Sequence, residues 1–335
     1  MNAMFDRKTF LSVSASTLFA SAIGAYKWEE DSSRGRKRLP GFRPLSLKQI
    51  RIEAGAERAF RAIHVSDTHL VRADRTDNDP RKVELAARRY PEMGFGEHYL
   101  TQAIDLAISD GSLLLHTGDM IDFVSNANLK LAECYFGTGD WFVAAGNHEF
   151  SKYVGEAKED AKYKSDSFAR VSASYPNDLA FCSRVVNGIN FVAADNVYYN
   201  FTFDQIERME AEVKKGLPII FMCHVPFYTP AHYAHQMELG KGLCSYQIGV
   251  PDRLVNTWRK PQNIIKGEEW QDRRVQQRAD KATVEFIEYL KAQTLVKAVL
   301  CGHCHEFWEE RFSPTAIQYV CSATYKGDGY DICIC

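Results

Sequence analysis

The sequence lacks an excess of charge of either sign. Its 41 Lys and Arg and 43 Asp and Glu leave a net charge of −2. A near-neutral balance argues against nucleic acid as a partner, because proteins that bind it usually present a basic surface. The chain also has no internal repeat and no low-complexity tract. With 335 residues, 45% of them hydrophobic, it can form one large or two modest domains whose core needs no disulfides.

Cysteine is missing from the first part of the chain, and all nine cysteines lie between Cys134 and Cys335. Nine is an odd number, so at least one has no partner within the chain, and the pairing stays open. Cys301 and Cys304 form a C-x-x-C motif, which is typical of a redox pair or of half a zinc site. No second C-x-x-C completes a zinc ribbon. We interpret Cys301 as the buried end of a strand, with a thiol oxidoreductase as the alternative.

The start of the chain has no apolar run long enough to be a clear membrane span. Arg7 and Lys8 precede Ser, Ala and other small residues that continue to Ala25. A charged start, an apolar stretch and small residues around 20–22 are the three parts of an export signal. We therefore expect residues 1–38 to be an export signal and linker, and the protein to be periplasmic or extracellular. The export route, a retained membrane anchor and a helix of the folded domain stay open.

Residues that bind metals follow the first apolar strand. The predicted strand 58–66 ends at Asp67-Thr68-His69. Residues at i and i+2 of an extended backbone point to the same side, so we expect Asp67 and His69 to face one site. A carboxylate and an imidazole there form half a metal site. His64, within the strand, is interpreted as a core or supporting histidine.

The next elements predict a parallel sheet. Helices are expected at 97–109 and 128–136, each followed by an apolar strand, at 113–115 and 141–145. The resulting β-α-β-α-β order implies crossover helices. Ligands of such sheets bind beyond the carboxyl ends of the strands.

Later segments repeat this pattern of polar strand ends. The apolar run 218–223 ends at His224, and the strand 296–301 ends at His303 and His305. Asn187-Gly188 is a hairpin turn signal between two further apolar runs. A hairpin is therefore expected there.

Residues 226–280 are expected to be a long, mostly irregular insertion. Its aromatic and basic side chains suit stacking on a base and contact with phosphate, and they suit equally well packing beneath a loop. Both interpretations stay open for Tyr228, Tyr233, Trp258, Trp270, Arg253 and Arg259.

Five strand-end segments now stand in order along the chain: Asp67-Thr68-His69, Gly118-Asp119-Met120-Ile121-Asp122, Gly146-Asn147-His148-Glu149, Cys223-His224, and Gly302-His303-Cys304-His305. Together they resemble the calcineurin-like metallophosphoesterase family, over about residues 60 to 310. The resemblance implies an α/β fold in which two mixed β-sheets pack as a sandwich flanked by helices. It makes residues 39–335 a single catalytic domain.

The resemblance also implies a dinuclear metal centre. One ion would be held by Asp67, His69, Asp119 and His305, and the second by Asp119, Asn147, His224 and His303. Asp119 would bridge the two. Oxygen and nitrogen donors without thiolate suit Mn, Fe or Zn. Such a pair of ions generates hydroxide from water and polarises a phosphoryl oxygen.

Other residues would assist the centre without binding metal. His148 would stabilise or protonate the leaving group. Asp122 and Glu149 would support the ligands, with a solvated surface role as the alternative for each. Purple acid phosphatases carry a tyrosine where Asp122 stands, and the leader makes the chain more similar to exported bacterial phosphatases and phosphodiesterases.

The function implied is hydrolysis of a small-molecule phosphate monoester or diester. The alternative is a protein of the same fold that uses its metals for binding or as a scaffold, without turnover. No stable protein partner is inferred. The substrate, the metals and the oligomeric state stay open.

Overall fold

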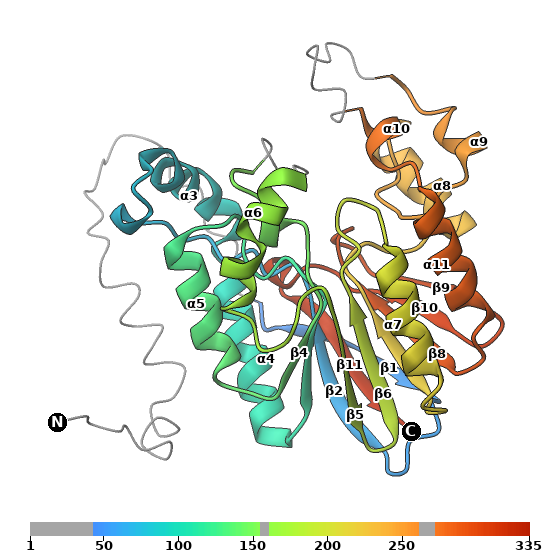
Figure 1. The fold of residues 1–335 in the computed structure, drawn as a ribbon. Helices are drawn as coiled ribbons and strands as arrows, with labels where there is room; N and C mark the ends of the chain where they lie inside the picture. Colours follow the sequence, from blue (N-terminus) through green and yellow to red (C-terminus); the bar gives the residue numbers. More distant parts are fainter. Residues whose placement is uncertain (1–42, 155–160, 261–271) are drawn as a thin grey trace. The chain divides into compact units, whose positions relative to one another are not determined.

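The strands of the protein form two sheets (Figure 1). The computed structural model describes residues 43–154, 161–260 and 272–335, and residues 45–335 form one unit. The expected export signal and linker lie outside the described residues. No helix in the described ranges is long and apolar enough to cross a membrane.

The first sheet has the strand order β1-β11-β2-β3-β4. Its strands β2 (Phe60–Val65), β3 (Leu113–His116) and β4 (Trp141–Val143) are parallel. They are connected through α4 (Gly96–Asp110) and α5 (Asn126–Phe136). The predicted β-α-β-α-β order is therefore confirmed, and the three strands end at the same edge.

The last strand lies between the first two. β11 (Asp328–Ile334) pairs in parallel with β1 (Ser46–Ile52) and antiparallel with β2. β1 and β2 follow each other in the chain, yet they do not pair. Burial explains the order, because β11 buries Tyr330, Ile332 and Ile334 completely whereas β1 is largely exposed and suits an edge.

The second sheet has the order β5-β6-β7-β8-β10-β9. β5 (Phe181–Val186) and β6 (Ile189–Ala194) form the predicted hairpin. Asn187 and Gly188 turn the chain with φ of 47° and 78°, the conformation that a type I′ turn requires. The remaining strands are β7 (Ile219–Met222), β8 (Val296–Cys301), β9 (Trp308–Arg311) and β10 (Ile317–Val320).

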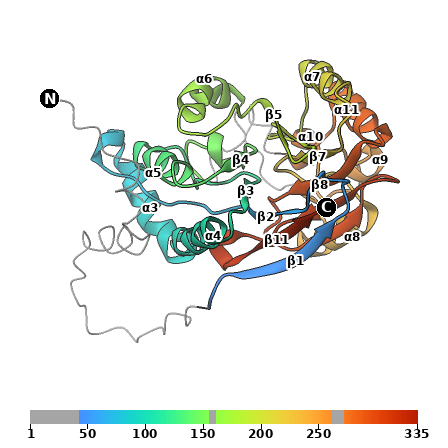
Figure 2. The same cartoon turned by 90° about the horizontal axis from the view of Figure 1, so that it is seen from below.

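Three apolar layers hold the two sheets and their helices together (Figures 1 and 2). The middle layer lies between the sheets and joins residues of both, such as Phe142 of β4 and Phe191 of β6, whose rings lie 6.3 Å apart. The outer face of the first sheet packs against α4 and α5. The outer face of the second packs against α7 (Phe203–Val213) and α11 (Lys281–Ala292). The expected sandwich of two mixed sheets flanked by helices is confirmed.

The insertion is more regular than expected. It contains α8 (Pro230–Leu239), α9 (Asp252–Val255) and α10 (Arg273–Gln276). α8 has no cap from its own N-cap side chain, but Glu310 of β9 accepts hydrogen bonds from the backbone of Ala231 and His232 (3.2 and 3.0 Å). A distant carboxylate thus satisfies the exposed amides of the first turn and favours the helix dipole, which local sequence does not reveal.

α7 begins with a capping box formed by Thr202 and Gln205. The remaining elements are η1 (Arg75–Asp77), α3 (Pro80–Met93), η2 (His148–Phe150), α6 (Ala161–Ser172) and η4 (Thr324–Lys326).

Candidate metal centre

The strand-end segments turn in the left-handed region of backbone conformation. Five of the expected ligands have positive φ: Asp67 (53°), His69 (51°), Asp119 (57°), His303 (72°) and His305 (56°). The expectation of an extended backbone at Asp67 and His69 is therefore wrong, although both side chains still face one site. The turns are held by pairing between neighbouring loops, as His69 N–H donates to Asp119 O (2.9 Å).

Two glycines let the loops after β3 and β4 meet. A Cβ on Gly118 would lie 2.6 Å from the backbone of Gly146, and one on Gly146 would lie 2.2 Å from the backbone nitrogen of Asp119. Gly146 therefore allows the two backbones to approach more closely than any residue with a side chain would. Any side chain at either position would push Asp119 away from the site.

One group of donors gathers around Asp67 and His69. It joins Asp67, His69, Asp119 and His305. His305 Nε2 lies 3.1 Å from Asp67 Oδ1, and His69 Nε2 lies 3.8 Å from Asp119 Oδ2. The three residues Asp67, His69 and Asp119 are buried, and His305 is partly exposed. This is the set expected for the first ion.

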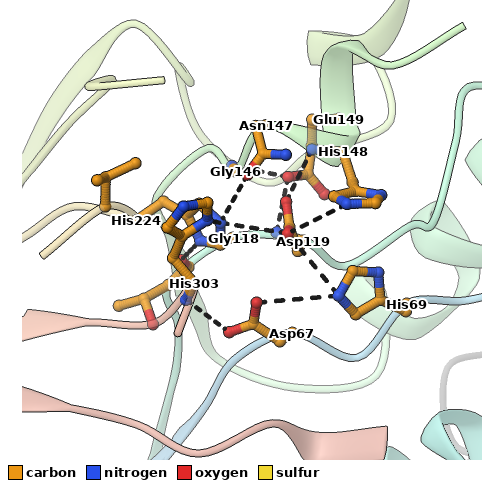
Figure 3. Close-up of polar contacts among 12 residues, drawn as sticks. Asp67, His69, Gly118, Asp119, Gly146, Asn147, His148, Glu149, His224 and His303 are labelled. Carbon is orange, nitrogen blue, oxygen red and sulfur yellow. Dashed lines mark hydrogen bonds and ion pairs between the residues drawn. The ribbon is translucent and has the colours of Figure 1, made fainter. Parts of the chain in front are cut away.

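A second group lies on the other side of Asp119, which belongs to both (Figure 3). His224 Nε2 lies 3.2 Å from Asp119 Oδ2, 3.2 Å from Asn147 Oδ1 and 3.2 Å from His303 Nδ1. His224 Nδ1 donates to the carbonyl oxygen of Thr117 (2.7 Å), which leaves Nε2 to face the group. All seven expected ligands are thus brought together, with Asp119 in the shared position.

The polar atoms of these groups fit cations. Buried Asp67 Oδ1 accepts no well-aligned hydrogen bond, although His305 Nε2 lies 3.1 Å from it. His69 Nε2 and His305 Nε2 face each other at 3.3 Å. His69 Nδ1 is already held by the Asp122 carboxylate (2.9 Å), so its Nε2 presents a lone pair to the site. Lone pairs and a bare carboxylate oxygen converging in a buried space are stabilised by positive charge. The donors are oxygen and nitrogen atoms, with no thiolate among them.

Electrostatics favour anionic carboxylates here. Burial alone would raise the pKa of Asp67, but His305 and His224 hold it well below its usual range. Burial likewise opposes ionisation of Asp119, and His224 and His148 outweigh it. Burial lowers and the Asp119 carboxylate raises the pKa of His224, with a result of about 10. The centre therefore attracts cations or protons.

Asp122 supports His69 from behind. Its carboxylate faces His69 Nδ1 and accepts two hydrogen bonds from Arg89 of α3, both at 2.8 Å. His69, Asp122 and His148 also lie close enough together to suggest a third metal group. The Arg89 guanidinium already supplies a cation there, so we assign no metal to it. The solvated role considered for Asp122 does not hold, because Asp122 is completely buried.

Glu149 is also buried, and its carboxylate binds backbone N–H groups rather than the side chains of the expected metal ligands. Its carboxylate accepts hydrogen bonds from the backbone of Gly146 (2.7 Å), Asp119 (2.8 Å) and Met120 (2.7 Å), and from Tyr175 Oη (2.8 Å). Burial, followed by the Asp119 charge, raises its pKa. A surface role for Glu149 is therefore wrong as well.

His148 lies beside the centre and faces the solvent side. Its Nδ1–H donates to the backbone oxygen of Asp122 (2.6 Å), and its Nε2 lies 4.0 Å from Asp119 Oδ2. Its side chain keeps 14% of its surface exposed. The ring is thus fixed with Nε2 available, as a proton donor to a bound ligand needs to be.

Two further histidines stay neutral in the core. Burial lowers the pKa of His64 and of His116 to about 3. His64 contacts Thr117 and His116 contacts Thr68, at 2.8 and 3.0 Å. Neither belongs to a donor group, which agrees with the supporting role expected for His64.

All nine cysteines are free thiols. Cys301 is the buried end of β8, as expected, and its Sγ lies 3.6 Å from Cys223 Sγ. Burial raises the pKa of the Cys301 thiol. Reactive thiols have a lowered pKa and some exposure, so the environment of Cys301 speaks against the thiol oxidoreductase alternative.

A pocket of about 320 Å³ opens beside the two donor groups and His148. The insertion forms one wall of it, through Gln236 and Leu239 of α8, Tyr246 and Arg273. None of these four residues was predicted from the sequence to line the site. Tyr228, Tyr233 and Trp258 instead pack into a small core of the insertion, and Arg253 and Arg259 do not line the pocket. Trp270 lies outside the described residues.

The geometry can be compared with known proteins. The sequence model described as calcineurin-like phosphoesterase matches residues 60–307. The chain belongs to this family. No curated protein matches the chain. The matched range covers all seven expected ligands, His148 and the four residues of the insertion that line the pocket.

Solved structures show more distant similarity. A dimetal phosphatase from Danio rerio is 11% identical, with 79% of this chain and 88% of that chain covered and a TM-score of 0.41. Purple acid phosphatase PPD1 from yellow lupin, Lupinus luteus, is 12% identical, with 84% and 46% covered and a TM-score of 0.43. Calcineurin-like phosphoesterase YfkN from Bacillus subtilis is 10% identical, with 80% and 82% covered and a TM-score of 0.38. The chain thus spans about half the length of the lupin enzyme.

The contacts of Asp122 lead to a prediction about metal affinity. In Asp122→Asn, His69 loses the carboxylate that orients its ring, and Arg89 loses its partner. We expect the affinity for Mn²⁺, measured by calorimetric titration, to fall by about 10- to 100-fold. Asp178→Asn removes an exposed carboxylate whose ion pair with Arg208 spans 3.5 Å, and it should leave the affinity unchanged. Equal affinity in Asp122→Asn and the wild type would show that His69 needs no such support.

Proposed function

We propose that this protein hydrolyses phosphate monoesters or diesters of small molecules, with two divalent transition-metal ions held by the two donor groups. The observation that carries the proposal is the buried Asp119 carboxylate shared by both groups. When bound, such ions polarise phosphoryl oxygens and lower the pKa of water. Mn, Fe and Zn each suit the donors.

The side chains of the protein position the phosphate group and transfer a proton. Asp67, His69 and His305 on one side, and Asn147, His224 and His303 on the other, fix where the phosphate group binds. The hydrogen bond from His148 Nδ1 to Asp122 O aims Nε2 at the pocket, where it donates a proton to the leaving oxygen. The loops from β2, β3, β4, β7 and β8 converge here because parallel strands of each sheet end at one edge.

The first test measures turnover. Purified protein with added Mn²⁺ should hydrolyse p-nitrophenyl phosphate or bis(p-nitrophenyl) phosphate, and exhaustive chelation should abolish the activity because the donor groups lose their ions. Asp119→Asn weakens the shared ligand, so metal content measured by elemental analysis should fall together with the rate. A protein that binds two ions and hydrolyses no phosphate ester of a broad panel would instead be the binding or scaffold protein of the alternative.

A second test separates His148 from the ligands. His148→Ala should keep both ions and lower kcat by about 10²- to 10⁴-fold on an alkyl ester, the usual loss for a general acid. The loss should be smaller on an aryl ester, because p-nitrophenolate needs little protonation to leave. The proposal for His148 fails if the variant loses metal as Asp119→Asn does, or if both esters slow by the same factor.

We also propose that residues 1–38 direct export and take no part in the catalytic unit. The support is the charged start followed by small and apolar residues. Protein that begins at Leu39 should be soluble and should match the full chain in Mn²⁺ content and kcat. Loss of solubility or activity in the shortened protein alone would place the segment in the fold.

A further inference from the structure

The insertion forms one wall of the pocket. Gln236, Leu239, Tyr246 and Arg273 line this wall, and the rest of the lining comes from donor-group residues, His148, Tyr199 and Cys304. At about 320 Å³ the pocket is at the small end of ligand sites. A bound phosphate ester therefore reaches this wall with whatever group its ester oxygen carries.

Hydrogen bonds connect the insertion wall to the chain segment that carries the expected metal ligand His305. Glu306 follows His305, and its carboxylate faces His232 Nε2 (3.2 Å) and His235 Nε2 (2.9 Å) and accepts from the Gln236 amide, all from α8. Glu310 on β9 caps the same helix. α8 is thus fixed at both its first turn and its inner face, so Gln236 and Leu239 keep a set position relative to His305.

Arg273 reaches the wall through an aromatic contact. Its guanidinium carbon lies 5.6 Å from the centre of the Tyr246 ring, and that ring lies 5.8 Å from the ring of His303 at an angle of 70°. A cation over an aromatic face is attracted to it and held in place. Among the described residues that line the pocket, Arg273 is the sole Arg or Lys.

We propose that Arg273 is a specificity-determining residue that binds a second anionic group of the substrate, a phosphate or a carboxylate beyond the phosphate that is cleaved. The inference rests on the proposed function in that the metal centre takes the scissile phosphate. That phosphate is held by the two donor groups, and the Arg273 guanidinium lines the same pocket where it packs on the Tyr246 ring. Arg273 Nη1 donates to Gln276 Oε1, and a guanidinium has five N–H donors whose paired geometry matches the oxygens of phosphate or carboxylate. Substrates with a second anion are therefore favoured over neutral alkyl esters.

The test measures binding, so that it is independent of turnover. Protein loaded with Mn²⁺ is titrated calorimetrically with alkylphosphonates, with ω-phosphonocarboxylates and with α,ω-bisphosphonates, over alkyl spacers of two to six carbons. In the wild type, at least one series with two anions should bind more tightly than the alkylphosphonate of the same length. Arg273→Gln should reduce that preference by about 10-fold or more, the usual effect of losing a charge-assisted hydrogen bond, and Arg273→Lys should retain part of it.

A matched control uses another arginine of the insertion. Arg253 is exposed on α9 and does not line the pocket, so Arg253→Gln should keep the preference. The titrated phosphonates also bind Mn²⁺ in solution. This contribution is the same for every protein variant, so it cancels when the variants are compared. The series that gains affinity identifies the anion as carboxylate or phosphate.

The proposal is overturned if no series with two anions binds better than its alkylphosphonate. It is also overturned if Arg273→Gln keeps the wild-type preference, which would leave Arg273 with a packing role on Tyr246. Failure of the proposed function would look different, because the protein would then bind these ligands yet hydrolyse no phosphate ester.

Discussion

The buried carboxylate of Glu149 is the interaction on which the site depends. Its oxygens accept backbone N–H groups on both sides of Asp119 and at Gly146, so one side chain joins the loops that follow β3 and β4. Asp119, Asn147 and His148 all lie in these two loops. A buried charge is tolerated only when such donors surround it. These hydrogen bonds hold the two loops together.

The backbone of the ordered site is strained. Asp67, His69, Asp119, His303 and His305 all adopt the left-handed conformation, which costs about 1–3 kcal/mol at a residue other than glycine. The net stability of a typical domain is about 5–15 kcal/mol. Five such residues therefore require the pairing of neighbouring loops, the glycine contacts and the Asp122 and Glu149 carboxylates. Stability of the whole domain is used to hold seven side chains in place.

Local signals in the sequence predict much of this molecule. The hairpin at Asn187-Gly188, the cap at Thr202 and the parallel strands around Asp119 follow from short-range rules. The seven candidate ligands follow from the family resemblance that the strand-end motifs carry. The features that the sequence did not predict depend on contacts between residues far apart in the chain. α8 is capped by Glu310 from another element, and Arg273 enters the pocket wall through Tyr246. The left-handed turns at Asp67 and His69 arise from pairing with the β3 loop, which no neighbouring residue specifies.

The place of β11 has a consequence for synthesis of the chain. This strand lies between β1 and β2, although it leaves the ribosome long after both. Until β11 is synthesised, the edges of β1 and β2 that will pair with it have no partner strand other than each other. Contacts between residues so distant in sequence form slowly, and unpaired strand edges promote association between chains. The nascent protein therefore passes through a period in which its first sheet lacks a central strand and is exposed to aggregation.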